Sequence, residues 1–325
     1  MNTAQPILEV SNLAKDFGEI RALSNVSFNI QRGQVLGFIG ANGAGKTTTM
    51  RIVATLEQPT MGLIKIAGYD VVNFPRQVRN FIGWMPDAYG RYSRVTVFEY
   101  LDFYARAYGY RSSERTIRVQ EVMDFVDLNP LRDRDTDALS KGMAQRLCLG
   151  RMLLHDPALL LMDEPAAGLD PKARVEFKHL VRLLAKSNKA VLISSHILSE
   201  LEDMCDSILF INGGEIAHHG STESLKQSNS KQIIVNIRVA ENVDGFVGWI
   251  ALQPGIEVLE RLKDGCRVAF ETNDPAMISA TLKRMLVEGF LVLDFHRQER
   301  RLEEAFIDFL EDSESKVESK NSGEQ

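Results

Sequence analysis

The sequence predicts an α/β protein with a mostly parallel sheet, followed by a second, smaller α+β unit. Short apolar runs at 35–39, 159–162 and 190–194 have the length expected of buried strands. Residues 47–56 follow the first run and residues 171–186 follow the second, both with helical spacing. Strands that alternate with helices are typical of a parallel sheet covered by helices. The length of 325 residues corresponds to about two domains.

The composition is that of a globular protein, with 44% hydrophobic and 25% charged residues. The formal net charge of −6 argues against general coating of DNA, which needs a basic surface, so we expect no nucleic-acid partner. Cys148, Cys205 and Cys266 lack metal-ligand or redox spacing, which favours buried thiols in a reducing compartment. Residues 1–6 lack the features of a secretory signal. No segment approaches the roughly 20 apolar residues of a membrane helix.

The first unit, residues 1–222, is expected to contain further strands and a group of helices. Residues 7–10 and 26–30 alternate between apolar and polar side chains, as strands do. Residues 87–150 combine helical spacing with many aromatic side chains, and we expect a helical subdomain there. The pair His218-His219 is expected in a turn.

A second pattern begins after a segment rich in Ser, Gln, Asn and Lys, which predicts a linker at 223–231. Beyond it, residues 232–311 have the element order βαββαβ of a ferredoxin-like domain, with an additional helix at 302–310. Residues 312–325 are polar and expected to be disordered. Asp274 and Pro275 open the second helix as N-cap and first residue. The strands are predicted at 233–239, 256–259, 267–270 and 291–295, the first helix at 243–252, and the apolar face of the second at Met277, Ile278, Leu282, Met285 and Leu286.

The segment from Gly40 to Thr47 fits the phosphate-binding pattern G-x-x-x-x-G-K-[ST] between a strand and a helix. Glycines let backbone N–H groups surround phosphates, and the start of the helix adds partial positive charge. Lys46 is expected to reach the β- and γ-phosphates, and the Thr47 hydroxyl to coordinate Mg²⁺. The motif is compatible with a GTPase, a kinase or an ATPase, although Val191 replaces the Asp that a guanine-specificity motif at Asn188-Lys189 would need. The predicted nucleotide contacts are Gly40, Asn42, Gly43, Ala44, Gly45, Lys46, Thr47 and Thr48.

Two carboxylates, Asp163 and Glu164, directly follow the second buried strand. The carboxyl ends of parallel strands face the ligand crevice of an α/β sheet. We expect Asp163 to hold Mg²⁺ and Glu164 to polarise the attacking water as a general base. His196 follows the third buried strand, so it is expected at the same sheet edge, where it can hydrogen-bond a γ-phosphate and orient the water. The predicted catalytic residues are therefore Glu164, His196 and Lys46.

A further motif indicates a family. Leu139-Ser140-Lys141-Gly142-Met143 precedes the two carboxylates and resembles the L-S-G-G-Q signature of the ATP-binding subunits of ABC transporters. Its Lys-Gly-Met variant resembles the signature of the ABC-2-type export branch. The resemblance covers residues 7–220 in motif order, and it includes an aromatic residue at Phe17, the segment Gly168-Leu169-Asp170 and the pair Ser195-His196.

The resemblance implies a P-loop ATPase cassette, built from parallel, antiparallel and helical parts, that uses ATP and Mg²⁺. In this family two subunits pack head to tail, and Ser140 and Gly142 of one subunit contact the nucleotide on the P-loop of the other. Phe17 is expected to stack on adenine. Where the family usually has Gln in the loop after the strand at 81–85, this chain has Asp87. The resemblance makes Asp87 a candidate to reach Mg²⁺ through water or to contact a partner.

The resemblance also implies a membrane partner. In the family, the region after the Gln loop receives a short helix from a multi-helix permease. Tyr and Phe are enriched in interface cores, and this region is rich in both, although the rings are also suited to the core of the helical subdomain. The aromatic residues are Tyr89, Tyr92, Phe98, Tyr100, Phe103, Tyr104, Tyr108 and Tyr110.

The function predicted first is therefore an ATP-hydrolysing subunit that dimerises with a second copy or a related subunit and drives a separate permease, for export. Such a subunit is expected in the cytoplasm, on the cytoplasmic face of the membrane. The alternative is a non-transport ABC ATPase that acts on a nucleic-acid or ribosomal partner. The chain lacks the long coiled-coil arms of DNA-repair relatives and the paired cassettes of translation factors.

Overall fold

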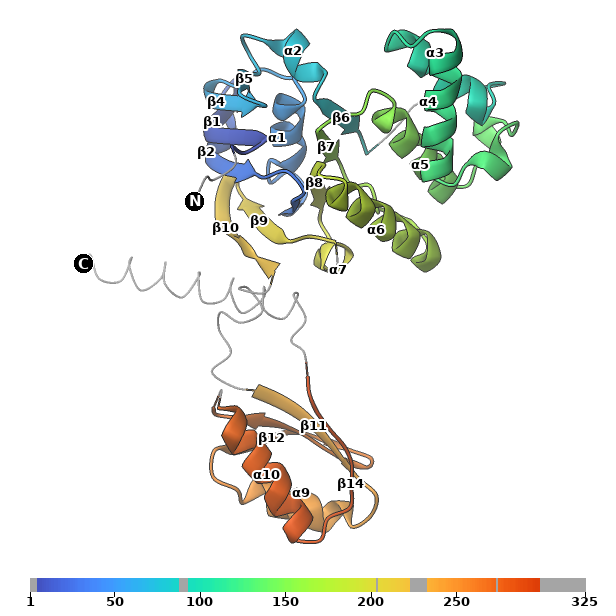
Figure 1. Cartoon of the computed structure of the whole chain (residues 1–325). Coiled ribbons are helices and arrows are strands. Elements are labelled where there is room, and N and C mark those ends of the chain that lie inside the picture. The colour runs from blue at the N-terminus through green and yellow to red at the C-terminus, as the bar shows by residue number, and fades with distance from the viewer. Residues whose placement is uncertain (1–4, 88–92, 203, 223–232, 273, 299–325) are drawn as a thin grey trace, which may run out of the picture. The chain divides into compact units, whose positions relative to one another are not determined.

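The computed structural model describes residues 5–87, 93–202, 204–222, 233–272 and 274–298. The chain divides into two compact units, residues 1–222 and 223–325 (Figure 1). The predicted linker at 223–231, the helix at 302–310 and the tail at 312–325 lie outside the described residues. No helix in the described part of the chain is long and apolar enough to cross a membrane.

Two sheets form the centre of the first unit (Figure 1). A six-stranded sheet has the order β10-β9-β3-β8-β7-β6, and only its edge strand β10 runs antiparallel to its neighbour. Its strands are β3 (Val35–Ile39), β6 (Ile82–Met85), β7 (Leu159–Met162), β8 (Ala190–Ser195), β9 (Ser207–Asn212) and β10 (Glu215–Ser221). A four-stranded antiparallel sheet has the order β2-β1-β4-β5, from β1 (Leu8–Phe17), β2 (Ile20–Ile30), β4 (Met61–Ile66) and β5 (Tyr69–Asp70).

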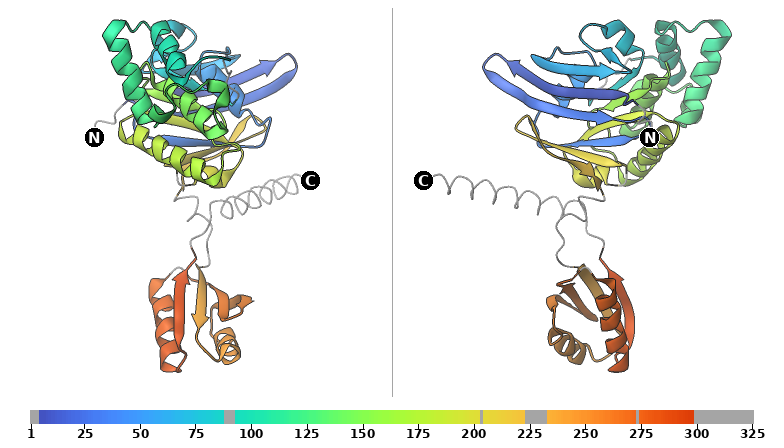
Figure 2. Two further views of the ribbon diagram at one scale, coloured as in Figure 1. Left: turned by 90° about the vertical axis from the view of Figure 1, so that its right-hand side faces the viewer. Right: turned by 60° about the vertical axis from the view of Figure 1, so that its left-hand side comes forward.

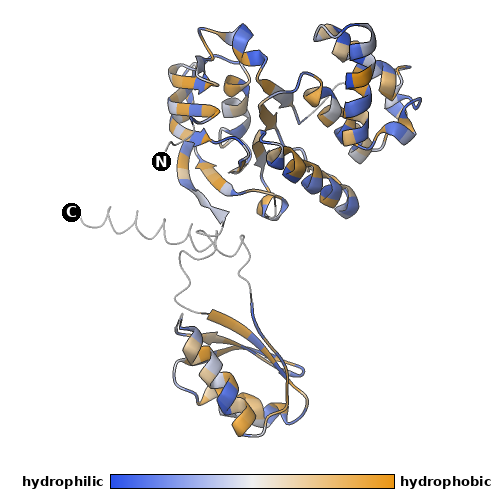
Figure 3. Ribbon diagram, in the orientation of Figure 1, coloured by the Kyte–Doolittle hydropathy of each residue, from blue (hydrophilic) through white to orange (hydrophobic). Residues whose placement is uncertain are grey.

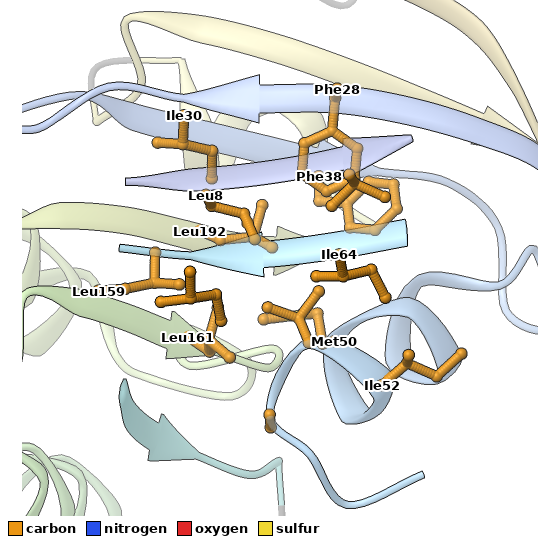
Figure 4. Packing of buried hydrophobic residues seen from close by; sticks show 14 of the residues in the cluster. Leu8, Phe28, Ile30, Phe38, Met50, Ile52, Ile64, Leu159, Leu161 and Leu192 are labelled. Atoms are coloured by element: carbon orange, nitrogen blue, oxygen red, sulfur yellow. The ribbon is translucent and has the colours of Figure 1, made fainter. Parts of the chain in front are cut away.

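Helices cover the parallel strands. Helix α1 (Lys46–Val53) contributes Met50, which converges in the core with Leu161 of β7 and Ile64 of β4 (Figure 4). Helix α6 (Pro171–Lys186) carries hydrophobic and hydrophilic residues along its length, as an amphipathic helix does (Figure 3). The short helices are α2 (Pro75–Arg79) and α7 (Leu198–Leu201). Because β3, β7 and β8 are parallel neighbours, the segments that follow them begin at the same edge of the sheet.

The remaining helices of the first unit form a group of their own, which appears in green in Figure 1 and Figure 2. It contains α3 (Val97–Ala107), α4 (Ser112–Phe125) and α5 (Lys141–Leu153), with single turns at Asn129–Leu131 and Thr136–Ala138. A capping box starts α3, because Thr96 accepts a hydrogen bond from the Glu99 N–H and the Glu99 carboxylate accepts one from the Thr96 N–H.

The second unit has the predicted βαββαβ order. Its elements are β11 (Ile233–Val239), α9 (Val243–Ala251), β12 (Ile256–Leu262), β13 (Gly265–Phe270), α10 (Pro275–Val287) and β14 (Val292–Arg297). The strands form an antiparallel sheet in the order β12-β13-β11-β14. Phe246 of α9 and Met285 of α10 are buried against Val235 and Ile237, so both helices pack on the same face of the sheet. Asp274 caps α10 as predicted, accepting a hydrogen bond from the Ala276 N–H.

Three sequence predictions about local structure are wrong. His218 and His219 lie in β10, not in a turn, and they pair with Phe210 and Leu209 of β9. Because β10 is a half-buried edge strand, its apolar alternation is weak. Leu286 is 56% exposed and does not belong to the buried face of α10. Helix α1 ends earlier than predicted, since Thr55 adopts a left-handed conformation with φ of 61°.

Candidate active site

The loop between β3 and α1 is shaped by glycines. Gly45 directly precedes α1 with φ of 111°, a conformation that side chains with a Cβ rarely adopt. At Gly40 a Cβ would lie 2.4 Å from the Ile211 carbonyl oxygen, so only glycine fits there. Beside Gly43 the space for a Cβ is open. The first turn of α1 follows, and its N–H groups have no acceptor within the helix. The loop therefore offers backbone donors and open space, which suits a polyphosphate.

Lys46 carries the positive charge of this loop, and its side chain is almost fully buried. Its Nζ donates hydrogen bonds to the carbonyl oxygens of Gly40, at 2.7 Å, and Ala41, at 3.2 Å. The same Nζ lies 3.6 Å from Oε1 of Glu164, at the end of β7. Lys46 thus lies between the glycine loop and the carboxylate that the sequence predicts as general base.

Asp163 is 3% exposed and is held by two hydroxyl groups. The Ser194 hydroxyl donates a hydrogen bond to Asp163 Oδ1 at 2.6 Å, and the Thr47 hydroxyl lies 3.4 Å from the same oxygen. The Asp163 N–H donates to the Met85 carbonyl oxygen of β6. These contacts fix the carboxylate beside the start of α1. A threonine hydroxyl and a carboxylate are oxygen ligands of the kind that Mg²⁺ prefers.

Glu164 lies between a lysine and a histidine. Its Oε2 is 2.8 Å from Nδ1 of His196, and its Oε1 faces Lys46. The carboxylate side chain is 14% exposed, whereas the His196 side chain is 43% exposed, so solvent reaches the pair from the histidine side. The Glu164 backbone has φ of 48°, a conformation that non-glycine residues rarely adopt. The carboxylate is therefore partly desolvated yet accessible to a water molecule.

Ser194 is a residue of this cluster that the sequence patterns did not predict. It is fully buried at the end of β8, and its hydroxyl oxygen accepts a hydrogen bond from the Glu164 N–H at 2.9 Å while donating to Asp163. One side chain therefore fixes both residues of the carboxylate pair. The sequence signal is a polar residue at the end of an otherwise apolar run, two positions before His196.

The other predicted site residues lie apart from this cluster. Phe17, at the end of β1, is 48% exposed, and the Lys15 ammonium lies 4.7 Å from its ring centre. Asp87 is exposed just after β6, and the described residues give it no hydrogen bond or ion pair. Ser140 caps α5 by accepting a hydrogen bond from the Met143 N–H. Gly142 packs so closely against α6 that a Cβ would lie 3.0 Å from Cβ of Ala173.

The start of α5 lines a pocket of about 350 Å³, whose walls include Ser140, Gly142, Arg146, Asp170 and Lys172. Among the described residues, none of the glycine loop at 40–47 lines this pocket. Within one chain the glycine loop at 40–47 and the signature segment at 139–143 therefore form separate surfaces.

A second hollow, of about 630 Å³, lies over α3. Phe98 and Phe103 line it together with Arg94 and Arg106. The aromatic residues of this region lie both in the core of the helical subdomain and on its surface, because Tyr100 is 4% exposed whereas Phe103 is 60% exposed. Tyr89 and Tyr92 lie outside the described residues.

Comparison with known proteins places this geometry in a family. The family model described as ABC transporter matches residues 23–167. The ABC transporter ATP-binding protein NatA of Bacillus subtilis (strain 168) is 35% identical over 228 residues, which cover 70% of this chain and 93% of that protein. The chain belongs to the ABC transporter ATP-binding proteins. As a member of this family, it is an ATPase and its first unit binds ATP.

Two further comparisons extend this result. Another ABC transporter ATP-binding protein of B. subtilis (strain 168), YxlF, is 32% identical over 301 residues, covering 93% of this chain and 98% of its own length. The similarity therefore reaches into the second unit. The solved structure described as the ATP binding subunit of an ABC transporter is 30% identical, with a TM-score of 0.62, and covers 68% of this chain and 92% of that one. Its coverage is close to the extent of the first unit.

Proposed function

We propose that this ABC transporter ATP-binding protein hydrolyses ATP between two subunits and uses the energy to drive a separate membrane permease. The observation that carries the proposal is the contact of Glu164 with both Lys46, at 3.6 Å, and His196, at 2.8 Å. A carboxylate that can act on water, a lysine and an imidazole at the mouth of a glycine loop are together able to support phosphoryl transfer to water.

The glycine loop binds the phosphates. N–H groups from Gly43 to Thr48 surround the β-phosphate, and Lys46 moves its ammonium from the loop carbonyl oxygens to the β- and γ-phosphates. Thr47 and Asp163 would hold Mg²⁺, since the Thr47 hydroxyl oxygen and Asp163 Oδ1 lie 3.4 Å apart. When bound, the ion neutralises charge on the phosphate oxygens. Among the described residues no group of three or more His, Cys, Asp or Glu side chains is placed to hold a metal ion.

Glu164 is the general base of the proposed reaction. Its carboxylate accepts a hydrogen bond from the attacking water and takes up the proton as the oxygen approaches the γ-phosphorus. His196 contacts the same carboxylate and is exposed toward solvent, so it can orient the water and hydrogen-bond the γ-phosphate. Lys46 stabilises the negative charge that develops on the phosphate oxygens.

A second subunit completes each site. Ser140 and Gly142 lie at the start of α5, where a helix N-terminus favours an anion, yet they line a pocket apart from the loop at 40–47. In the proposed dimer they contact the ATP on the glycine loop of the other subunit.

Phe17 is exposed and stacks on adenine. Asp87 replaces the usual Gln and lies exposed just after β6, where it would reach the metal through water or contact the permease.

The hollow over α3 receives the permease. Its exposed Phe103 and its two arginines offer an apolar surface with a charged rim, the anatomy of a protein interface. The chain would thus work on the cytoplasmic face of the membrane. Export is supported by relatives named for it: the Nod factor export ATP-binding protein I of Ralstonia nicotianae is 34% identical over 220 residues, which cover 68% of each chain.

Affinity purification from membranes tests this function. A tagged chain should recover a multi-helix permease, and Phe103→Ser should abolish the recovery because it removes the exposed ring in the hollow. Ile117→Ser is the matched control, since Ile117 is 59% exposed on α4 but lies outside the hollow. Recovery of ribosomes or DNA in place of a permease would instead support the non-transport alternative.

A further inference from the structure

A buried charged contact lies beside His196. Glu200, in the short helix α7, is 1% exposed, and a buried carboxylate is costly unless it is paired. Its Oε2 accepts a hydrogen bond from the Ser195 hydroxyl at 2.8 Å. Its Oε1 lies 3.3 Å from Nη2 of Arg174 on α6. The residue immediately before His196 is therefore held by a buried acid.

The Ser195 hydroxyl also holds the residue after His196. Its oxygen accepts a hydrogen bond from the Ile197 N–H at 3.0 Å while its hydrogen is donated to Glu200. One buried side chain thus restrains the backbone on both sides of the histidine. Helix α7 has only four residues, too few to be stable as an isolated helix, so it depends on tertiary contacts, which include the Ser195–Glu200 hydrogen bond and the buried side chains of Leu198 and Leu201.

The His196 side chain itself is little restrained. It is 43% exposed, and among the described residues its hydrogen-bond partner is Oε2 of Glu164. Packing therefore contributes little to the direction of the imidazole. That direction depends on the backbone at 195–197, which the side-chain contacts of Ser195 help to hold, together with the pairing of Ser195 with Ile39 of β3.

Arg174 connects this arrangement to α6. It lies in the first turn of α6, where its N–H donates to the Asp170 carbonyl oxygen at 3.0 Å. Its Nε is buried and has no hydrogen-bond partner among the described residues, whereas the side chain as a whole is 35% exposed, and Glu200 is the carboxylate that faces the guanidinium. The start of α6 and the backbone around His196 are thus linked through one ion pair.

We propose that Ser195, Glu200 and Arg174 are positioning residues that direct His196 toward Glu164. The proposal rests on the roles of Glu164 and His196 in the proposed function. A small change in the backbone at 195–197 displaces the imidazole relative to the carboxylate, and a displacement of about 1 Å can reduce the rate about 100-fold. A purely structural role would instead change stability and leave the catalytic step of the folded protein intact.

The first test uses Ser195→Ala and Ser195→Thr in the full-length chain. Loss of the hydroxyl should lower kcat about 10- to 100-fold with KM for ATP nearly unchanged, and Thr, which keeps a hydroxyl, should restore most of the rate. Ser207→Ala is the control, because it removes a buried serine hydroxyl that accepts a hydrogen bond from Gln34, at the opposite end of the parallel strands. An unchanged kcat in Ser195→Ala, or an equal loss in Ser207→Ala, overturns the proposal.

The second test asks whether Ser195 and Glu200 act through His196. In a His196→Ala background, adding Ser195→Ala or Glu200→Gln should leave the single-turnover rate unchanged, because no imidazole remains to be directed. A full additional loss in that background contradicts the proposal. Glu164→Gln in an otherwise unchanged chain tests the proposed function separately: if it stops hydrolysis while Ser195→Ala does not, the function stands and the positioning role fails.

Discussion

The proposed hydrolysis site consists of a few side chains, and Glu164 contacts most of the others. It contacts Lys46 on one side and His196 on the other, while Ser194 holds its N–H. The chemistry therefore depends on one carboxylate whose surroundings come from two other segments of the chain, the start of α1 and the end of β8.

Glu164→Gln should bind ATP but hydrolyse it about 10²- to 10⁴-fold more slowly, because the amide cannot accept the proton of water. ATP should then hold the variant as a stable dimer. Phosphate release measures the first effect and size-exclusion chromatography with ATP measures the second. Hydrolysis at the wild-type rate would remove Glu164 from the role of general base.

His155 is expected to make the stability of the first unit depend on pH. Burial lowers the pKa of its imidazole, which stacks on Tyr108 at 4.3 Å and lies 2.8 Å from the Ile82 carbonyl oxygen. The pKa of His155 is lower in the folded state than in the unfolded state. The stability that the buried imidazole contributes is therefore complete above the unfolded pKa of about 6.5, and it is lost as the pH falls below that value toward the folded pKa.

His155→Gln should therefore reduce the fall in Tm between neutral pH and mildly acidic pH. Thermal unfolding, monitored by circular dichroism at both pH values, measures this difference in Tm. His179→Gln, at an exposed position on α6, should leave the pH dependence of Tm as in the wild type. A variant at His155 with an undiminished acid sensitivity would show that other groups dominate.

At the scale of elements, the starts of helices position several of the proposed contacts. The starts of α1 and α5 present the proposed phosphate contacts, whereas α3 begins with the capping box of Thr96 and Glu99. Helix α3 also forms the hollow proposed for the permease. The stability of its first turn is therefore linked to that surface.

Thr96→Ala should destabilise the first unit by about 1 kcal/mol, the usual value of an N-cap side chain. For a domain of this size that is a fall of about 2–4 °C in Tm. Thr96→Ser keeps the hydroxyl and should retain most of the stability. Equal Tm values for the Ala and Ser variants would show that the cap contributes nothing measurable.

The sequence predicted the elements next to the site better than those away from it. The runs that became β3, β7 and β8 are buried on both faces, so they are continuous and apolar and easy to recognise. β10 is a half-buried edge strand in which histidines and glycine replace apolar residues, so no pattern marked it. The contact of Ser194 with Asp163 links residues 31 positions apart, and local spacing carries no information about it.

At the scale of the whole molecule, the chain has one glycine loop and one signature segment, which lie on separate surfaces. Two copies packed head to tail would bring each loop to the signature of the other. Both sites would then depend on the assembly rather than on either chain.

A mixing experiment tests this arrangement. Lys46→Ala and Ser140→Arg subunits should each be inactive alone, since every dimer of one type has two damaged sites. Mixed, they form heterodimers in which one site combines an intact loop with an intact signature, so ATPase activity should reappear. Because Ser140 caps α5, the Tm of Ser140→Arg must be measured beside it. Activity of Lys46→Ala alone, or a wild-type chain that works unpaired, would contradict shared sites.

The left-handed backbone conformation of Glu164 lowers the stability of the fold at the residue on which the proposed hydrolysis depends. A side chain with a Cβ at φ of 48° costs roughly 1 kcal/mol or more relative to an unstrained residue, and glycine at the same position would relax that strain. Variants selected only for heat resistance should therefore tend to replace the residue on which hydrolysis depends. An engineered thermostable form would have to gain its stability elsewhere and leave this strained residue in place.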